Sequence, residues 1–276
     1  TLADRGEYIA SESTIYRVLH DEDMQHRRGA TRAPTHRPRE HVATGPWQVA
    51  SWDFTYLKSH VRGQFFFLYL VLDVWSRKIL GWEVHTEESS ELSSTLIDRI
   101  RAEAHPTVDL TGWVLHSDNG SPMKGATMLA TLQRLGVVAS FSRPRVSDDN
   151  PFSESLFRTM KYGPTYPRDG FATVEDAREW VAAFVGWYNL EHKHSGIGFV
   201  TPADRHDGDD LAILEKRRAV YAAAQARNPE RWARRPRTWA RPSEVRLNPE
   251  HGRSATVVTS VTSDNSRSHE ETALHA

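Results

Sequence analysis

Three segments near the start of the chain have the residue pattern of β-strands, and they limit the possible folds more than any other feature. Apolar and polar residues intermingle from Trp47 to Leu57 as in a strand, and Gly63 to Asp73 is apolar enough to be buried on both faces. Arg77 to His85 makes a third strand, and turns at Gly63 and at Ser76–Arg77 separate the three. We therefore expect an antiparallel meander.

The segments that follow alternate between helical and extended patterns. We expect a helix from Ser89 or Ser90 to about Ala104, a strand over residues 112–116, a helix over 123–135 and a strand over 137–141. Further helices are expected from Pro151, over 173–190 and over 211–226. An antiparallel meander followed by β-α-β units predicts an α/β fold, with a mixed five-stranded sheet flanked by helices.

The composition excludes several classes of protein. The chain has no cysteine, which removes disulfides, Cys-ligated zinc and thiol nucleophiles, and is consistent with a reducing cytoplasm. The longest purely apolar run, residues 65–72, is far shorter than the ~20 residues of a membrane helix. The N-terminus has neither a secretory signal nor an initiator Met, so we expect a cytoplasmic fragment or processed product without membrane contact.

The net charge of −1 gives no bulk attraction to nucleic acid, but basic residues are concentrated in two blocks. Residues 24–41 contain five arginines and one acid, and residues 216–241 contain nine basic residues and one acid. Such blocks either contact phosphates or form solvated faces. Within the second block, the candidates for DNA contact are Arg231, Arg234, Arg235 and Arg237.

Three acids stand where the expected sheet ends or is accessible. Asp53 lies within a strand, Asp118 directly follows the strand that ends at His116, and Glu154 lies in the first turns of the helix that begins at Pro151. Singly they have ordinary explanations: a hydrogen-bonded strand residue, a turn residue and a helix-dipole partner. Together they form a set of hard oxygen ligands suited to Mg²⁺ or Mn²⁺.

The spacing and the surrounding residues resemble a known family. Residues 119–153 place 35 positions between Asp118 and Glu154, and the three acids lie in Trp-Asp-Phe-Thr, His-Ser-Asp-Asn-Gly-Ser and Asp-Asn-Pro-Phe-Ser-Glu motifs. With Lys161, Tyr188–Asn189, His194 and Thr201–Pro202 downstream, residues 47–205 resemble the catalytic core of retroviral-integrase-like DDE transposases, in particular those of bacterial insertion sequences.

This resemblance implies an RNase H-like fold and DNA strand cleavage and transfer with two Mg²⁺ or Mn²⁺ ions. Asp53 would bridge both ions, while Asp118 and Glu154 would each bind one. Transposon ends and target DNA would be the substrates, and a homo-oligomer on DNA is expected because two ends must be joined. The cytoplasmic protein would then be nucleoid-associated when bound to DNA.

The same resemblance divides the chain into five parts. Residues 1–25 would be a remnant of a helix-turn-helix DNA-binding module with a helix over 11–20, and residues 26–46 a basic linker. After the core at 47–205, we expect a basic helical extension over 206–253 and a disordered tail over 254–276.

Other side chains near the acids allow two interpretations. Lys161 and Arg158 lie on the same side of their expected helix as Glu154, and either contact DNA phosphates or are plain surface residues. His116 either orients a phosphate or fills space. Tyr188, Asn189 and His194 either contact DNA or form a structural network that links their helix to the helix of Glu154.

Three functions remain possible at this point. The first is an active transposase, the second is a truncated DNA-binding relative without transposition activity, and the third is an RNase H-like nuclease. Retention of all three acids favours the first, and the basic C-terminal segment disfavours the third. A serine hydrolase is excluded because the chain has no Gly-x-Ser-x-Gly motif.

Overall fold

The computed structural model describes residues 12–22, 39–143, 149–231 and 238–249. The chain divides into two units, residues 1–37 and residues 38–276. Within the first unit, α1 (Glu12–Asp21) is the helix that the sequence predicts over residues 11–20. The expected tail over residues 254–276 lies outside the described residues.

The centre of the second unit is a mixed sheet, as predicted. Its strands are β2 (Val49–Lys58), β3 (Phe65–Asp73), β4 (Ile79–His85), β5 (Val114–Ser117) and β6 (Val138–Phe141), in the order β4-β3-β2-β5-β6. β2, β3 and β4 pair antiparallel as the predicted meander, whereas β5 and β6 pair in parallel. The parallel pairing places Ser117, at the end of β5, opposite Trp52 within β2.

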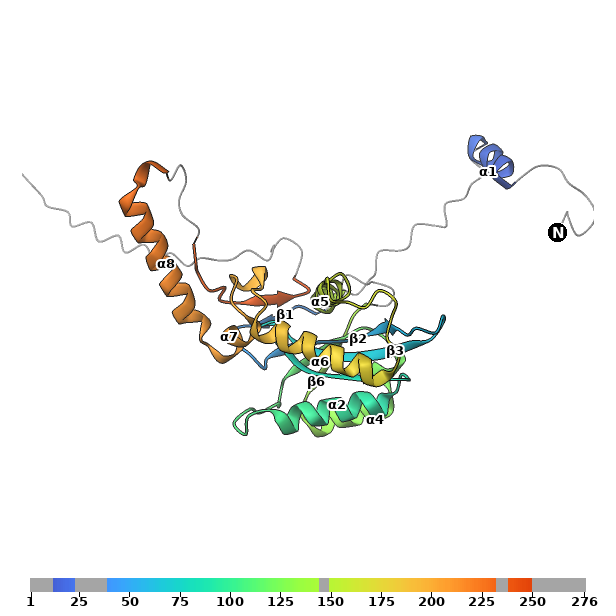
Figure 1. Ribbon diagram of the computed structural model, residues 1–276. Coiled ribbons are helices and arrows are strands. Elements are labelled where there is room, and N and C mark those ends of the chain that lie inside the picture. Colours follow the sequence, from blue (N-terminus) through green and yellow to red (C-terminus); the bar gives the residue numbers. More distant parts are fainter. Residues whose placement is uncertain (1–11, 23–38, 144–148, 232–237, 250–276) are drawn as a thin grey trace, which may run out of the picture. The chain divides into compact units, whose positions relative to one another are not determined.

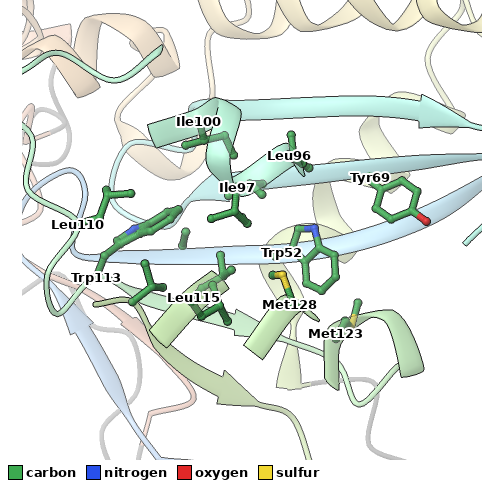
Figure 2. Close-up of a cluster of buried hydrophobic side chains, with 14 residues drawn as sticks. Trp52, Tyr69, Leu96, Ile97, Ile100, Leu110, Trp113, Leu115, Met123 and Met128 are labelled. Carbon is green, nitrogen blue, oxygen red and sulfur yellow. The ribbon is translucent and has the colours of Figure 1, made fainter. Parts of the chain in front are cut away.

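Helices cover both faces of this sheet (Figure 1). On one face, α2 (Ser90–Glu103) and α4 (Ala126–Arg134) pack on a cluster around Trp52 and Trp113, which Figure 2 shows. On the other face, α5 (Pro151–Lys161) and α6 (Val174–Leu190) bury a second cluster, which contains Leu57, Leu68, Leu70, Leu72, Leu156, Met160 and Val181. Strand alternation explains the division, because Trp52 and Leu57 of β2 point to opposite faces.

The prediction of one continuous helix over residues 123–135 is wrong. The chain forms α3 (Ser121–Lys124) and then α4, with a break at Gly125. Gly125 has an extended ψ of 144°, and a Cβ at this position would lie 2.4 Å from the Cβ of Ser90 in α2. Close packing against α2 therefore coincides with the point where the helix is interrupted.

The segments on either side of the core pair with each other. β1 (His41–Ala43) and β7 (Val245–Leu247) form a two-stranded antiparallel sheet, although residues 41–43 were expected in a linker and residues 245–247 in a helical extension. Ala43 and Leu247 are fully buried in a cluster with Val74 and Trp75. Two very short strands are therefore stabilised mainly by packing on the core.

Beyond α6 the chain is largely helical, as expected. It forms a 3₁₀ turn (Ser195–Ile197), α7 (Pro202–Asp207), α8 (Asp210–Arg227) and a second 3₁₀ turn (Pro229–Arg231). Arg205 of α7 is fully buried, where its guanidinium stacks 3.9 Å over the Trp75 ring and its Nη1 lies 3.5 Å from Asp210 Oδ2. Arg241 reaches the same carboxylate oxygen at 3.0 Å. These contacts attach the C-terminal segment to the end of β3.

Among the described residues, no helix is both long and apolar enough to cross a membrane.

The contact between β4 and α2 yields a stability prediction. A Cβ at Gly81 would lie 2.4 Å from Ile100 Cγ1, so Gly81→Ala should destabilise the protein by about 1–3 kcal/mol through overpacking. Gly186→Ala in α6 is the control, because its Cβ would meet nothing within 4 Å and should stabilise by about 0.5–1 kcal/mol. Denaturant unfolding measures both, and equal effects would contradict the packing argument.

Candidate active site

Polar contacts dock α5 along one side of β2. The buried hydroxyl of Ser51 contacts both Asn150 Oδ1 and the hydroxyl of Ser153. At the other end of α5, Lys161 Nζ donates to Thr55 Oγ1 at 2.6 Å. Alternate side chains of a strand share a face, so Asp53 projects toward α5 between Ser51 and Thr55.

Asp53 interacts with both other acids. Burial, together with the negative charges of Asp118 and Glu154, raises the pKa of Asp53 to about 7, against the lowering effects of the Phe54 backbone N–H and Lys161. The Phe54 N–H donates to Asp53 Oδ1 at 2.8 Å. The three acids, from β2, the end of β5 and α5, therefore act electrostatically as one cluster.

Asp118 reaches this cluster through the parallel pairing of β2 with β5. Ser117 pairs with Trp52, so the residue after each, Asp118 and Asp53, lies at adjacent positions of the two strands. Asp118 Oδ1 accepts a hydrogen bond of 2.8 Å from the Ser142 hydroxyl, which follows β6. The end of β6 thereby holds the carboxylate of Asp118.

Carboxylate oxygens are the ligands that hard divalent cations prefer. The negative charges of Asp118 and Glu154 act on Asp53, and a bound cation would relieve this repulsion. In the described part of the chain, no group of three His, Cys, Asp or Glu side chains is arranged to hold an ion. The assignment of Asp53, Asp118 and Glu154 as ligands thus stays a prediction.

His116 of β5 contacts β6 and the segment just before α5, close to the three acids. It is fully buried, its Nε2–H donates to the carbonyl of Asp149 at 3.0 Å, and its Nδ1 lies 2.9 Å from Ser140 Oγ. Burial lowers the pKa of His116 to about 4, so the ring is neutral at physiological pH. Of the two roles that the sequence allowed, the structure supports the structural one, because a buried neutral ring with these partners is poorly suited to bind phosphate.

Sequence reasoning missed the residues that hold the acids in place. Asn150 is fully buried and also donates from Nδ2 to the Trp52 carbonyl at 3.2 Å, directly beside Asp53. Arg143 binds Asp149 through several hydrogen bonds, including Nη2 to Oδ1 at 2.9 Å, and so links the end of β6 to the start of α5. Their only sequence signal was the Asp-Asn-Pro motif, which is also typical of an ordinary turn.

The structure describes only some of the residues predicted to contact DNA. Lys161 is half-buried beside β2, where burial lowers its pKa and Asp53 opposes that shift, and Arg158 is exposed on α5. Arg231 ends the second 3₁₀ turn, and its side chain is not among those described. Arg234, Arg235 and Arg237 lie outside the described residues. All six DNA-contact assignments stay predictions.

Asn189 has a structural role. Its side chain accepts a hydrogen bond from the Ile79 backbone N–H at 2.9 Å and donates to the Ile79 carbonyl at 3.0 Å, which fixes α6 to β4. Tyr188 and His194 line a separate cavity on the α5 side.

Comparison with known protein families agrees with this architecture. Residues 43–147 match one family of integrase core domains, and residues 135–202 match a second family of the same description. Together the two matches contain β2 to α6 and all three acids of the cluster.

Curated relatives are bacterial transposases. The chain is 28% identical over 162 residues to the transposase for insertion sequence element IS904 of Lactococcus lactis, covering 59% of this chain and 62% of that protein. It is 26% identical over 175 residues to transposase InsF for insertion sequence IS3A of Escherichia coli, covering 63% and 58%. The match thus spans about three fifths of each relative.

A solved structure of the HTLV-2 integrase catalytic core domain in complex with magnesium is also similar, with 14% identity, a TM-score of 0.42, and coverage of 59% of this chain and 97% of that chain.

The chain therefore contains an integrase core over residues 43–202. In sequence it is similar to the transposases of insertion sequences IS904 and IS3.

The raised pKa of Asp53 predicts that the carboxylate costs stability in the metal-free protein. Its folded pKa of about 7 exceeds the ordinary value of 3.8, so the cost grows between these values and is complete above about pH 7. Asp53→Asn should therefore raise the free energy of unfolding at pH 8 in chelator by up to a few kcal/mol, and by less at pH 5.

Thermal unfolding at the two pH values measures this gain. Asp169→Asn, at an exposed loop position, is the matched control and should show no comparable gain. A loss of stability in Asp53→Asn at pH 8 would contradict the electrostatic argument.

Proposed function

We propose that this chain cleaves DNA strands and joins them to target DNA with divalent metal ions held by Asp53, Asp118 and Glu154. The observation that carries the proposal is the electrostatic coupling of Asp53 to the other two acids, within a matched integrase core. Two such ions, when bound, stabilise the attacking and leaving oxygens of an in-line phosphoryl displacement.

The roles of the chain's own residues follow from their positions. By analogy with the integrase core, Asp53 on the central strand would contact both ions, and Asp118 and Glu154 one each. Water would attack during cleavage and a DNA 3′-hydroxyl during joining, so no Ser or Tyr nucleophile is required. Lys161 and Arg158 on α5 would contact phosphates of the bound DNA end.

DNA ends and target DNA are the proposed partners, and joining two ends requires more than one active site in place, so we propose a homo-oligomer on DNA. A second candidate function is a DNA-binding relative without catalysis. It is favoured by one observation: in the part of the chain that the structure describes, the three acids are not arranged to hold an ion.

Substitution of the acids separates these two functions. Asp53→Asn, Asp118→Asn and Glu154→Gln should each abolish Mn²⁺-dependent strand transfer on oligonucleotide ends while DNA binding stays within about twofold, because only the metal ligands change. Asp169→Asn serves as the control that retains activity. If wild type is inactive, or if the Asp118→Asn variant transfers strands as wild type does, the catalytic proposal fails.

The basic segment gives an independent prediction about DNA affinity. Replacing Arg234, Arg235 and Arg237 together by Gln should weaken binding to all sequences and reduce the slope of log K against log salt by ~1 for each phosphate that is no longer neutralised. A control that replaces Arg101 and Arg134, on α2 and α4 at the opposite face from α5, should keep the slope. Fluorescence anisotropy at several salt concentrations measures it, and an unchanged slope in the triple variant rejects the assignment.

A further inference from the structure

A second group of hydrogen-bond donors surrounds a cavity between α5, α6 and the β3–β4 turn. The cavity has a volume of about 280 Å³, and its polar lining consists of Arg77, Ser155, Thr159, Tyr188 and His194. None of the residues that line it is acidic, and none belongs to the carboxylate cluster. A cavity with donors and no carboxylate repels cations and suits an anion.

Arg77 brings a positive charge to this cavity without an acidic partner. In the part of the chain that the structure describes, its guanidinium donates to the Val74 carbonyl and lies 4.1 Å over the Phe152 ring, and it forms no ion pair. The neighbouring carboxylate of Asp73 already accepts hydrogen bonds from the backbone N–H groups of Trp47 and Ser76. Burial lowers the pKa of Arg77 to about 10, which still leaves the group charged at neutral pH.

The backbone of Arg77 supports the same conclusion. Its φ of +69° lies in the left-handed region, where a non-glycine residue costs about 1–2 kcal/mol. A glycine would avoid this strain and would also remove a charge that is costly to bury. An unpaired arginine at a strained turn is therefore a candidate for a binding role.

Two neutral donors complete the lining. Tyr188 is only 2% exposed, and its hydroxyl forms no hydrogen bond with any described residue. His194 Nδ1 accepts a hydrogen bond of 3.0 Å from the Gly196 backbone N–H, which assigns the ring proton to Nε2. Burial lowers the pKa of His194 to about 4, so the ring stays neutral and Nε2–H is a donor. Both groups can therefore donate to a ligand oxygen in the cavity.

We propose that this cavity binds a phosphate group, with the Arg77 guanidinium, the Tyr188 hydroxyl and the His194 Nε2–H as its donors. One fixed positive charge with additional neutral N–H and O–H donors suits a tetrahedral oxyanion, whose oxygens accept several hydrogen bonds. Pro151 and Ser155 of α5 also line the cavity, and the first turns of a helix attract anions. The phosphate is either inorganic phosphate or part of a DNA backbone; the second source rests on the proposed function, whereas the pocket does not.

An exposed lining residue provides the cleanest test. Ser155 is exposed on α5, so Ser155→Asn and Ser155→Asp differ only in a charge at the edge of the cavity. In the metal-free protein, inorganic phosphate at constant ionic strength should raise the unfolding temperature in a saturable way. Ser155→Asn should keep the apparent Kd within about twofold, and Ser155→Asp should weaken it roughly tenfold or more.

Tyr188→Phe is an independent variant, because it removes the hydroxyl and keeps the ring stacked on Phe184 and His192. It should also weaken the phosphate response roughly tenfold, whereas Tyr162→Phe, at an 81% exposed tyrosine outside the cavity, should not. No saturable response in wild type, or equal responses in Ser155→Asp and Ser155→Asn, would overturn the proposal.

DNA binding then identifies the source of the phosphate. If Ser155→Asp and Tyr188→Phe weaken binding of a duplex oligonucleotide without divalent ions while Ser155→Asn does not, the pocket takes a backbone phosphate. If only the response to inorganic phosphate is lost, the pocket takes the free anion. Neither result depends on strand transfer by the three acids, so failure of the pocket and failure of the proposed function are distinguishable.

Discussion

The contact between Ser51 of β2 and the start of α5 determines where the rest of the site lies. One buried hydroxyl meets Asn150 and Ser153, and Asn150 also binds the Trp52 carbonyl. These groups are removed from water, so leaving any one of them without its partner would cost about 1–3 kcal/mol. The helix is thus fixed in both position and rotation, and Glu154 is carried to the side of β2 from which Asp53 projects. The acids themselves contribute repulsion rather than cohesion.

The general architecture follows from short-range patterns. The strand periods of residues 47–85 identified the antiparallel part of the sheet, and the alternation of helices and strands after Ser89 identified the parallel part. The three acids were recognisable because their spacing and adjacent residues are specific in combination, and the matched integrase core contains them all. Sequence alone could place them on the correct elements, but their role as metal ligands stays a prediction.

The features that sequence reasoning missed depend on contacts between distant residues. Nothing local marks His41–Ala43 as a strand, because its partner is about two hundred positions away in β7. The apolar period continues across Gly125, so only the proximity of Ser90 reveals the break between α3 and α4. Contacts between distant residues also explain part of the basic block over residues 216–241. Arg217 is bound to the carbonyls of Gly198 and Phe199, and Arg241 to Asp210, so part of the predicted basic block stabilises the fold.

The pairing of β1 with β7 also has a topological consequence. Because His41 lies opposite Leu247, the polypeptide arrives at the core and departs from it at one and the same place. The two ends of the segment 44–244 are thus held together by the three residue pairs of the β1–β7 sheet. Because its two ends lie close together, a domain of this kind can be inserted into a loop of another protein or circularly permuted without disrupting its sheet.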